Sequence, residues 1–313
     1  MARDLRIVFM GTPDYAVPCL KALADNGYDV PLVVTQPDKP KGRGRKMAPP
    51  PVKVAAEALG LAVAQPASVR TDDFIRTLKN IAPDLLVVVA YGKILPRAVL
   101  ELPALGAVNI HPSLLPRYRG PSPIQWAIAG MEAETGVTSI FMDEGMDSGD
   151  MILSARAPIS DEDTAADLHD RLAVLGADVL IDTLARIESG TATPVPQDPE
   201  AVTFAPLLKK THGRIDWNQP SARLRRFINA MTPWPGAFTE TGTRRYKILA
   251  ARPVTLEKKA SPGTVVTRFP DELVVATADG GLVVTRIQGE AGKPMDVADF
   301  LRGHAIAEGT RFA

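Results

Sequence analysis

The chain has 313 residues, of which 45% are hydrophobic and 23% charged, a composition typical of a folded globular protein. No apolar run reaches the length of a membrane span, and the N-terminal one is too short for a signal peptide, so no membrane partner is expected. The single cysteine, Cys19, cannot form an internal disulfide, which favours a cytoplasmic protein. The four histidines show no metal-ligand spacing, so no metal is expected.

The formal net charge of zero hides two halves of opposite sign. Residues 1–206 carry 19 Lys and Arg against 26 Asp and Glu, a net charge of −7. Residues 207–313 carry 17 against 10, a net charge of +7. This asymmetry suggests two domains, and the basic one is compatible with a polyanionic partner. A solvated basic surface would give the same count, so charge alone does not decide between them.

Short apolar segments alternate with helical patterns through the first two thirds of the chain. Strands are expected at 5–10, 30–35, 84–90, 107–110 and 137–142, and helices at 17–27, 123–130 and 164–190. Thr164 and Asp167 resemble a capping box at the start of the last helix. Such alternation predicts an α/β fold, a Rossmann-like parallel sheet with helices on both faces.

The pattern changes after residue 190. Four prolines between 191 and 206 predict an extended linker, and 221–231 resembles a short basic helix. The remainder consists mostly of strand-like segments, with Asp279-Gly280 as a hairpin signal. We therefore expect a Rossmann-like domain over 1–189, a linker over 190–208 and a smaller β-barrel over 209–313, with an OB-like barrel as one candidate.

Two polar clusters follow predicted strands. Asn109 and His111 are two residues apart, so both face the same side if the strand continues to His111. The acidic loop 143–150, which includes Asp147, follows the next strand. Since carboxyl ends of parallel strands share an edge, the two clusters are expected to meet in a ligand cleft. An amide, an imidazole and a carboxylate together suit acyl transfer.

Other sites fit these residues less well. The segment after the first strand lacks the G-x-G-x-x-G glycines, and neither a Walker motif nor a G-x-S-x-G elbow occurs. The acidic loop lacks the spacing of a calcium loop. A solvated turn for 143–150 and a purely structural role for His111 remain open alternatives at this stage.

A basic stretch interrupts the acidic first half. Within 36–51, five basic residues stand against the single acidic Asp38: Lys39, Lys41, Arg43, Arg45 and Lys46. Two glycines among them favour a mobile loop that could contact phosphates of a nucleic acid. A surface loop without any partner is the alternative.

The same motifs resemble the 10-formyltetrahydrofolate-dependent formyltransferases. The resemblance rests on "NIHPSLLPRYRG" from Asn109 to Gly120, followed by Asp147 in "GMDSGD", and on "TQPDKPKGRGRKMAPPPVK". It extends over essentially all of residues 5–313, with "RIDWNQPSARLRRFINAMTPWPGA" in the C-terminal part.

This resemblance implies transfer of the formyl group of 10-formyltetrahydrofolate to the α-amino group of methionine on initiator tRNA, for translation initiation. Asn109 and His111 would then stabilise the oxyanion, and Asp147 would orient His111 and relay protons. The four residues from Ser113 to Pro116 (Ser113, Leu114, Leu115 and Pro116) would lie along the folate. Lys41, Arg43, Arg45 and Lys46 would contact the tRNA, as would the C-terminal barrel. No metal is expected, and because nothing in the sequence demands more than one copy of the chain, a monomer is expected.

Two other functions remain to be weighed. A formyltransferase of the same family could act on a small amine, such as a sugar nucleotide or a purine precursor, but such a substrate would need neither the basic loop nor the basic C-terminal part. An RNA-binding protein with a vestigial cleft would be expected to lack the set formed by Asn109, His111 and Asp147, and all three are present.

Overall fold

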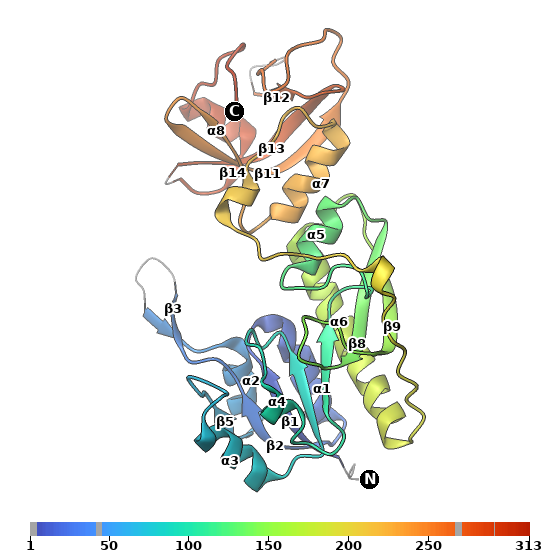
Figure 1. Cartoon of the computed structure of the whole chain (residues 1–313). Coiled ribbons are helices and arrows are strands. Elements are labelled where there is room, and N and C mark those ends of the chain that lie inside the picture. The colour runs from blue at the N-terminus through green and yellow to red at the C-terminus, as the bar shows by residue number, and fades with distance from the viewer. Residues whose placement is uncertain (1–4, 42–45, 267–270, 291) are drawn as a thin grey trace. The chain divides into compact units, whose positions relative to one another are not determined.

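The computed structural model describes residues 5–41, 46–266, 271–290 and 292–313, in two compact units (Figure 1). The first unit consists of 1–123, 134–158 and 169–206, and the second of 124–133, 159–168 and 207–313. Residues predicted as a linker fall mainly in the first unit, where Val195 pairs with Met151 and Phe204 with Arg119. The second unit therefore includes two short segments from the first two thirds of the sequence.

A seven-stranded sheet forms the centre of the first unit. In spatial order its strands are β5 (Val63–Ala64), β2 (Asp29–Val34), β1 (Arg6–Gly11), β6 (Leu85–Val89), β7 (Ala107–His111), β8 (Glu134–Phe141) and β9 (Met151–Pro158). The first five run parallel, whereas β8 is antiparallel to both β7 and β9. The sheet is thus Rossmann-like but mixed, and the prediction of a parallel sheet was wrong at this edge. Strands β8 and β9 form a hairpin, which needs no crossover helix.

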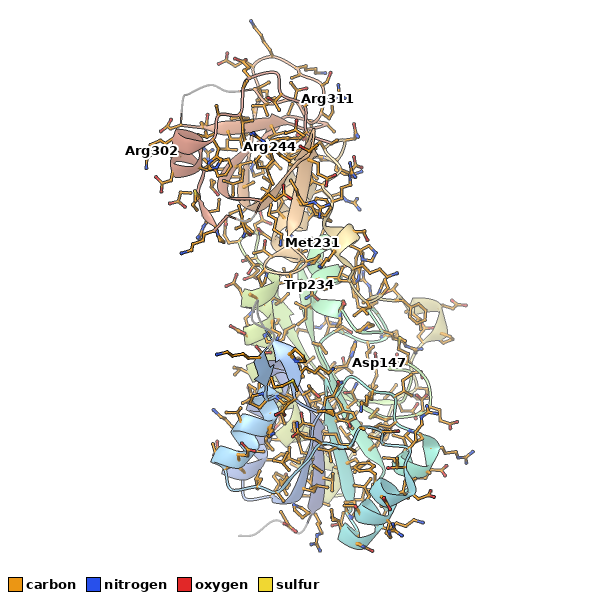
Figure 2. All side chains as sticks on the ribbon, turned by 90° about the vertical axis from the view of Figure 1, so that its left-hand side faces the viewer. Asp147, Met231, Trp234, Arg244, Arg302 and Arg311 are labelled. Carbon is orange, nitrogen blue, oxygen red and sulfur yellow. The ribbon has the colours of Figure 1, made fainter. Side chains whose placement is uncertain are left out.

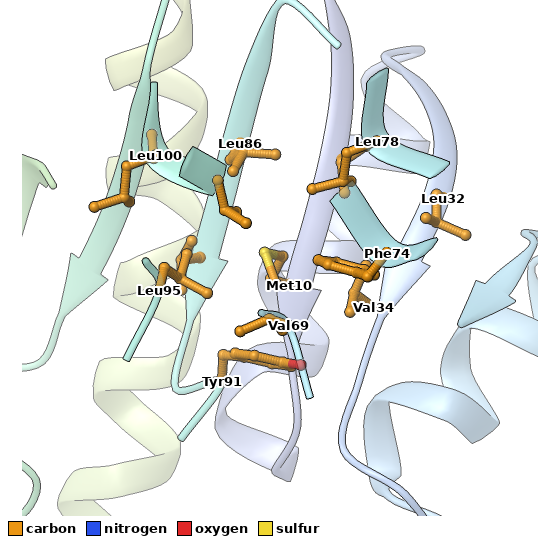
Figure 3. Close-up of a cluster of buried hydrophobic side chains, with 14 residues drawn as sticks. Met10, Leu32, Val34, Val69, Phe74, Leu78, Leu86, Tyr91, Leu95 and Leu100 are labelled. Carbon is orange, nitrogen blue, oxygen red and sulfur yellow. The ribbon is translucent and has the colours of Figure 1, made fainter. Parts of the chain in front are cut away.

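Helices cover the sheet on both sides. They are α1 (Val17–Asp25), α2 (Pro51–Ala58), α3 (Asp72–Ile81), α4 (Arg97–Leu100) and α6 (Ala165–Glu188), with a 3-10 turn at Asp14–Ala16. Phe74 and Leu78 of α3 pack with Met10 and Leu86 of the sheet in a buried cluster (Figure 3). On the opposite face, Gly176 of α6 lies beside Ile110. The expected capping box at the start of α6 is present, because Thr164 Oγ1 and the Asp167 carboxylate bond to each other's backbone N–H groups.

The sheet in the second unit is antiparallel, in the order β10 (Ala237–Thr241), β11 (Arg244–Val254), β13 (Gly281–Gly289) and β12 (Leu273–Ala276), with β14 (Met295–Asp296) also paired to β13. The helices are α5 (Pro123–Ala129), α7 (Ser221–Met231) and α8 (Val297–Gly303). The predicted helix over 221–231 and the predicted hairpin at Asp279-Gly280 are both confirmed. The pairings establish the antiparallel sheet, while an OB-like barrel stays a prediction.

The arms of the basic stretch form a small hairpin. Strand β3 (Lys39–Lys41) pairs antiparallel with β4 (Lys46–Ala48), so that Lys41 lies opposite Lys46 in the register. Among the described residues, no helix is long and apolar enough to cross a membrane.

Candidate active site

Strand β7 carries the first two side chains of the site. It lies between β6 and β8, and its residues Asn109 and His111 face the same side of the sheet, as the two-residue spacing predicts. His111 is only 4% exposed. Its Nε2 lies 3.0 Å from the carbonyl oxygen of Tyr118, and because a carbonyl only accepts, Nε2 carries the proton in this contact. Its Nδ1 is the nitrogen that faces Asp147.

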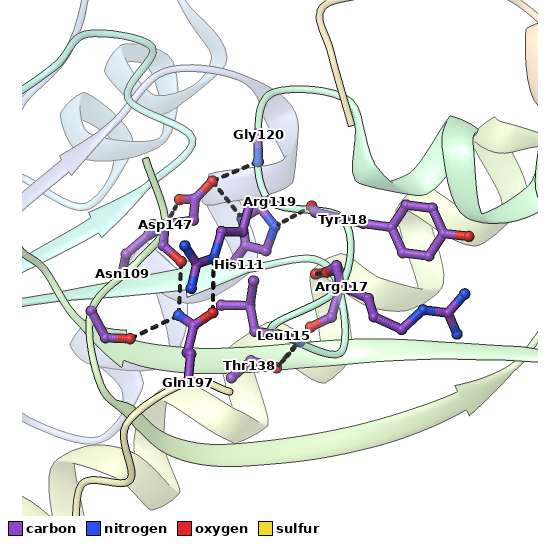
Figure 4. Close-up of polar contacts among 12 residues, drawn as sticks. Asn109, His111, Leu115, Arg117, Tyr118, Arg119, Gly120, Thr138, Asp147 and Gln197 are labelled. Atoms are coloured by element: carbon purple, nitrogen blue, oxygen red, sulfur yellow. Dashed lines mark hydrogen bonds and ion pairs between the residues drawn. The ribbon is translucent and has the colours of Figure 1, made fainter. Parts of the chain in front are cut away.

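Asp147 joins the two side chains of β7 (Figure 4). Its Oδ1 accepts a hydrogen bond of 3.2 Å from Asn109 Nδ2, and its Oδ2 lies 3.6 Å from His111 Nδ1. Oδ2 also accepts a hydrogen bond of 2.8 Å from the backbone N–H of Gly120. The amide, the imidazole and the carboxylate predicted from the sequence therefore lie together.

The route by which Asp147 reaches this place differs from the predicted one. Strand β8 is antiparallel to β7, with Phe141 opposite Val108, so its carboxyl end lies at the amino end of β7. The loop 142–150 begins beside Ala107, to whose oxygen Met142 N donates, and then runs back along β7 to Asn109. The expectation that both clusters follow carboxyl ends at one edge was wrong, although the side chains meet.

A cavity of about 480 Å³ lies beside these side chains. Asn109, His111 and Asp147 line it together with two walls, the segment 88–94 and the pair Met142 and Met146. A smaller adjoining cavity of about 190 Å³ shares Lys93, Ile94 and Met146. Ile94 is 72% exposed and Met146 56% exposed, so apolar side chains from both walls are open to a ligand.

The wall 88–94 is held in place by side chains from neighbouring loops. The Tyr91 carbonyl accepts from Thr12 Oγ1 and Gln36 Nε2, each at 2.9 Å, and Lys93 Nζ donates to the carbonyls of Pro66 and Ala67. The Tyr91 ring is buried, which raises the pKa of its hydroxyl to about 12. The tyrosine therefore stays neutral at ordinary pH and cannot serve there as a general base.

The four residues predicted to contact folate do not line these cavities. Ser113 and Leu115 are buried, and Ser113 Oγ donates to the Arg117 carbonyl at 2.7 Å. Thr138 Oγ1 donates to the Ser113 carbonyl and accepts from the Leu115 N–H. Leu114 and Pro116 are half-buried. This segment fixes the loop after β7, and its contact with folate stays a prediction.

The basic residues predicted to contact tRNA are described only in part. Lys46 is exposed in β4, and the backbone of Lys41 lies in β3. Arg43 and Arg45 fall outside the described residues. Within the described ranges, no group of three or more His, Cys, Asp and Glu side chains is placed to hold a metal ion.

Sequence reasoning missed three partners of the predicted set. Gly120 contributes its backbone N–H and Tyr118 its carbonyl oxygen. Tyr118 has a φ of +62°, which cannot be predicted from its residue type because tyrosine rarely adopts a positive φ. Gln197 donates from Nε2 to the Asp147 carbonyl and is one glutamine in a proline-rich segment. Only Gly120, at φ +117°, carries a sequence signal, since glycine is favoured where φ is positive.

Solved structures share this fold. An N-formyltransferase from Helicobacter canadensis, in complex with folinic acid and dTDP-3-aminofucose, aligns with a TM-score of 0.68 at 20% identity, covering 90% of this chain and 98% of its own. HypX from Aquifex aeolicus in complex with tetrahydrofolic acid aligns with a TM-score of 0.63 at 20% identity, covering 96% of this chain and 47% of its own. At such identity these likenesses establish the fold alone.

Sequence comparisons establish the family. The formyl transferase family matches residues 5–184, and the C-terminal domain of formyl transferases matches residues 207–305. Methionyl-tRNA formyltransferase of Desulforamulus reducens is 46% identical over 98% of this chain and 97% of its own length. The enzyme of the same name from Myxococcus xanthus is 47% identical over 98% of this chain and 97% of its own length. With both matched regions and near-complete coverage, the chain belongs to the formyl transferase family, as a member of the methionyl-tRNA formyltransferases.

Proposed function

We propose that the chain transfers the formyl group of 10-formyltetrahydrofolate to the α-amino group of methionine on initiator tRNA, giving N-formylmethionyl-tRNA. The observation that carries this proposal is the Asp147 carboxylate, which joins Asn109 and His111 at the side of a cavity in a chain of this family. No metal takes part in the proposed chemistry.

The chemistry requires a stabilised oxyanion and a route for one proton. The amine nitrogen attacks the formyl carbon, the new N–C bond forms, and the carbonyl oxygen gains negative charge. The Asn109 amide uses one N–H on Asp147, and its second N–H can donate to that oxygen. Collapse breaks the bond to N10 of the folate, and the proton lost by the amine passes to N10 through the pair formed by His111 and Asp147.

The folate is proposed to occupy the cavity beside these residues. Ile94 and Met146 offer exposed apolar surface along the cavity, which suits a flat aromatic ring system. The formyl group would then lie at Asn109. None of the four residues from Ser113 to Pro116 lines the cavity. We therefore propose that they contact only a part of the folate that extends outside it.

The tRNA is proposed to contact the basic parts of the chain. These are Lys41, Arg43, Arg45 and Lys46 of the basic stretch, together with the second unit. In that unit Arg244, Arg302 and Arg311 are exposed (labelled in Figure 2). We propose residues 1–189 as the catalytic domain, 190–208 as the linker and 209–313 as a tRNA-binding domain with an OB-like barrel. The working form would be a cytoplasmic monomer.

The test is formyl transfer from 10-formyltetrahydrofolate to charged initiator tRNA, with charged elongator methionine tRNA as the matched control. Transfer to the initiator and much less to the elongator is the expected result. A formyltransferase acting on a small amine would instead modify a sugar nucleotide or a purine precursor and leave the tRNA unmodified, and that outcome would overturn the proposal. The names of the full-length relatives favour the tRNA substrate.

A further inference from the structure

The segment 195–205 bonds to both loops that build the site. At one end, Val195 and Met151 exchange two backbone hydrogen bonds where β9 leaves the loop 142–150. At the other end, Arg119 N donates to the Thr203 carbonyl and Ala205 N donates to the Arg119 carbonyl, at 2.9 and 2.7 Å. The segment therefore spans from the loop that carries Asp147 to the loop that carries Tyr118 and Gly120.

Gln197 lies between these two ends, and its side-chain amide is fully engaged (Figure 4). Its Nε2 donates to the carbonyl oxygens of Asp147 and Gly149, both at 2.8 Å. Its Oε1 accepts from Arg119 Nε at 2.9 Å. The amide orientation is determined by chemistry, since carbonyls only accept and a guanidinium only donates.

Asp147 needs such support because its backbone is in the left-handed region, at φ +50°. A residue other than glycine carries a cost on the order of 1 kcal/mol in that region, so surrounding contacts must offset it. The conformation matters for the site, because it aims the carboxylate at Asn109, His111 and the Gly120 N–H at once. Gln197 bonds to the backbone of Asp147 and leaves the carboxylate free to contact those three groups.

We infer that Gln197 is a positioning residue for formyl transfer: through the carbonyls of Asp147 and Gly149 it holds the Asp147 carboxylate on Asn109 and His111. The inference rests on the proposed function for its catalytic consequence, and on the geometry alone for its effect on the loop 142–150. It also gives the proline-rich segment a role in the site itself.

Two substitutions remove the hydrogen bonds in different ways. Gln197→Ala removes the donors and the acceptor, whereas Gln197→Glu keeps the side-chain length and the contact with Arg119 but presents an ionised carboxylate to two carbonyls. Both should lower kcat by about 10- to 100-fold, because a small displacement of a catalytic group is enough for such a loss. KM for tRNA should change by less than about two-fold, since the proposed tRNA contacts lie outside the loop 142–150, whereas KM for folate should rise by a smaller factor than kcat falls, because Met146 of this loop lines the cavity. Glu200→Ala is the matched control, an exposed residue of the same segment.

A double-mutant cycle separates positioning from general damage. In an Asp147→Asn background, Gln197→Ala should lower kcat by less than about two-fold further, because its effect passes through Asp147. If the two losses multiply instead, Gln197 acts on the fold as a whole, and the inference is overturned.

Hydrogen exchange of the substrate-free protein supplies a readout that does not depend on activity. Amides of 142–150 and of Gly120 should exchange faster in Gln197→Ala than in the wild type, and Glu200→Ala should leave them unchanged. Unchanged exchange in Gln197→Ala would overturn the inference. If the wild type formylates no tRNA, the proposed function fails, and the exchange result still decides whether Gln197 holds the loop.

Discussion

At the scale of single residues, Asp147 is the point where the site is assembled. It bonds to Asn109 and Gly120 and approaches His111, while its own side chain is 18% exposed. The carboxylate thus orients an amide donor and an imidazole toward the same cavity. Hydrogen-bond donors fixed in advance near a developing oxyanion lower the barrier because they need no reorganisation during the reaction.

This arrangement predicts the effect of removing Asn109 or His111. Asn109→Ala removes the oxyanion donor and His111→Ala removes the imidazole of the proton route, so each should lower kcat by about 10²–10³-fold. The affinity for folate should change little, because the wall residues Ile94 and Met146 remain. Single-turnover kinetics with saturating substrates measure the loss, and equilibrium folate binding is the control. A variant that retained wild-type turnover would exclude that residue from the catalytic set.

At the scale of elements, the hairpin of β8 and β9 determines where Asp147 lies. Its loop 142–150 turns back along β7, and Gly149 allows this turn because a Cβ there would lie 1.7 Å from the Phe141 carbonyl oxygen. The close approach lets Phe141 N donate a hydrogen bond of 2.9 Å to the Asp150 carbonyl oxygen. Loop and strand are thus in contact at a position where only glycine fits.

Gly149→Ala should therefore displace the loop. We expect a loss of about 1–3 kcal/mol in the free energy of unfolding, as for other overpacked sites, and a fall in kcat as Asp147 moves. Gly303→Ala is the control, because a Cβ at the end of α8 meets open space. Thermal unfolding and the formylation assay measure the two effects. Wild-type stability and turnover in Gly149→Ala would contradict the close approach.

Strands β7 and β8 show which parts of the fold and of the site can be predicted from the sequence. Alternation along β7 predicts that Asn109 and His111 share a face, because that depends only on neighbouring residues. The direction of β8 was mispredicted, because an apolar run such as 137–142 suits a parallel or an antiparallel neighbour equally well. The hydrogen bond from Gln197 to the Asp147 carbonyl joins residues 50 apart in sequence, so no local sequence pattern predicts it. The cavity walls were missed for the same reason, since they come from two distant loops.

At the scale of the whole molecule, the two proposed substrates should respond differently to salt. Binding of a polyanion depends steeply on ionic strength because cations on the protein displace counterions from phosphates. KM for initiator tRNA should therefore rise strongly between low and physiological salt, while KM for folate changes little. Arg43→Ala should reduce the slope of log KM for tRNA against log salt by about one, with folate KM unaffected. Equal salt dependence for both substrates would contradict a tRNA role for the basic residues.

The second unit combines the C-terminal part of the chain with two short segments from the middle of the sequence. Arg226 of α7 is 4% exposed and donates to the carbonyls of Ser160 at 2.9 Å and Glu132 at 2.5 Å, and more weakly to that of Ile128. These carbonyls belong to segments within the region matched by the formyl transferase family, residues 5–184. Helix α7 is therefore bound to segments that precede the proline-rich segment in the sequence.

Arg226→Leu should consequently destabilise the second unit. It removes three hydrogen bonds that a largely buried guanidinium donates to carbonyls, and a loss of about 1.5–3 kcal/mol or more is expected, since one hydrogen bond to a charged group contributes about that much. Arg226→Lys keeps the charge but cannot reach several acceptors at once, so an intermediate loss is expected. All three tryptophans of the chain, Trp126, Trp217 and Trp234, lie in this unit, so denaturant unfolding followed by tryptophan fluorescence reports on it directly. Equal stability of the leucine variant and the wild type would mean that solvent or other side chains satisfy these carbonyls, and that Arg226 does not join the segments of the unit.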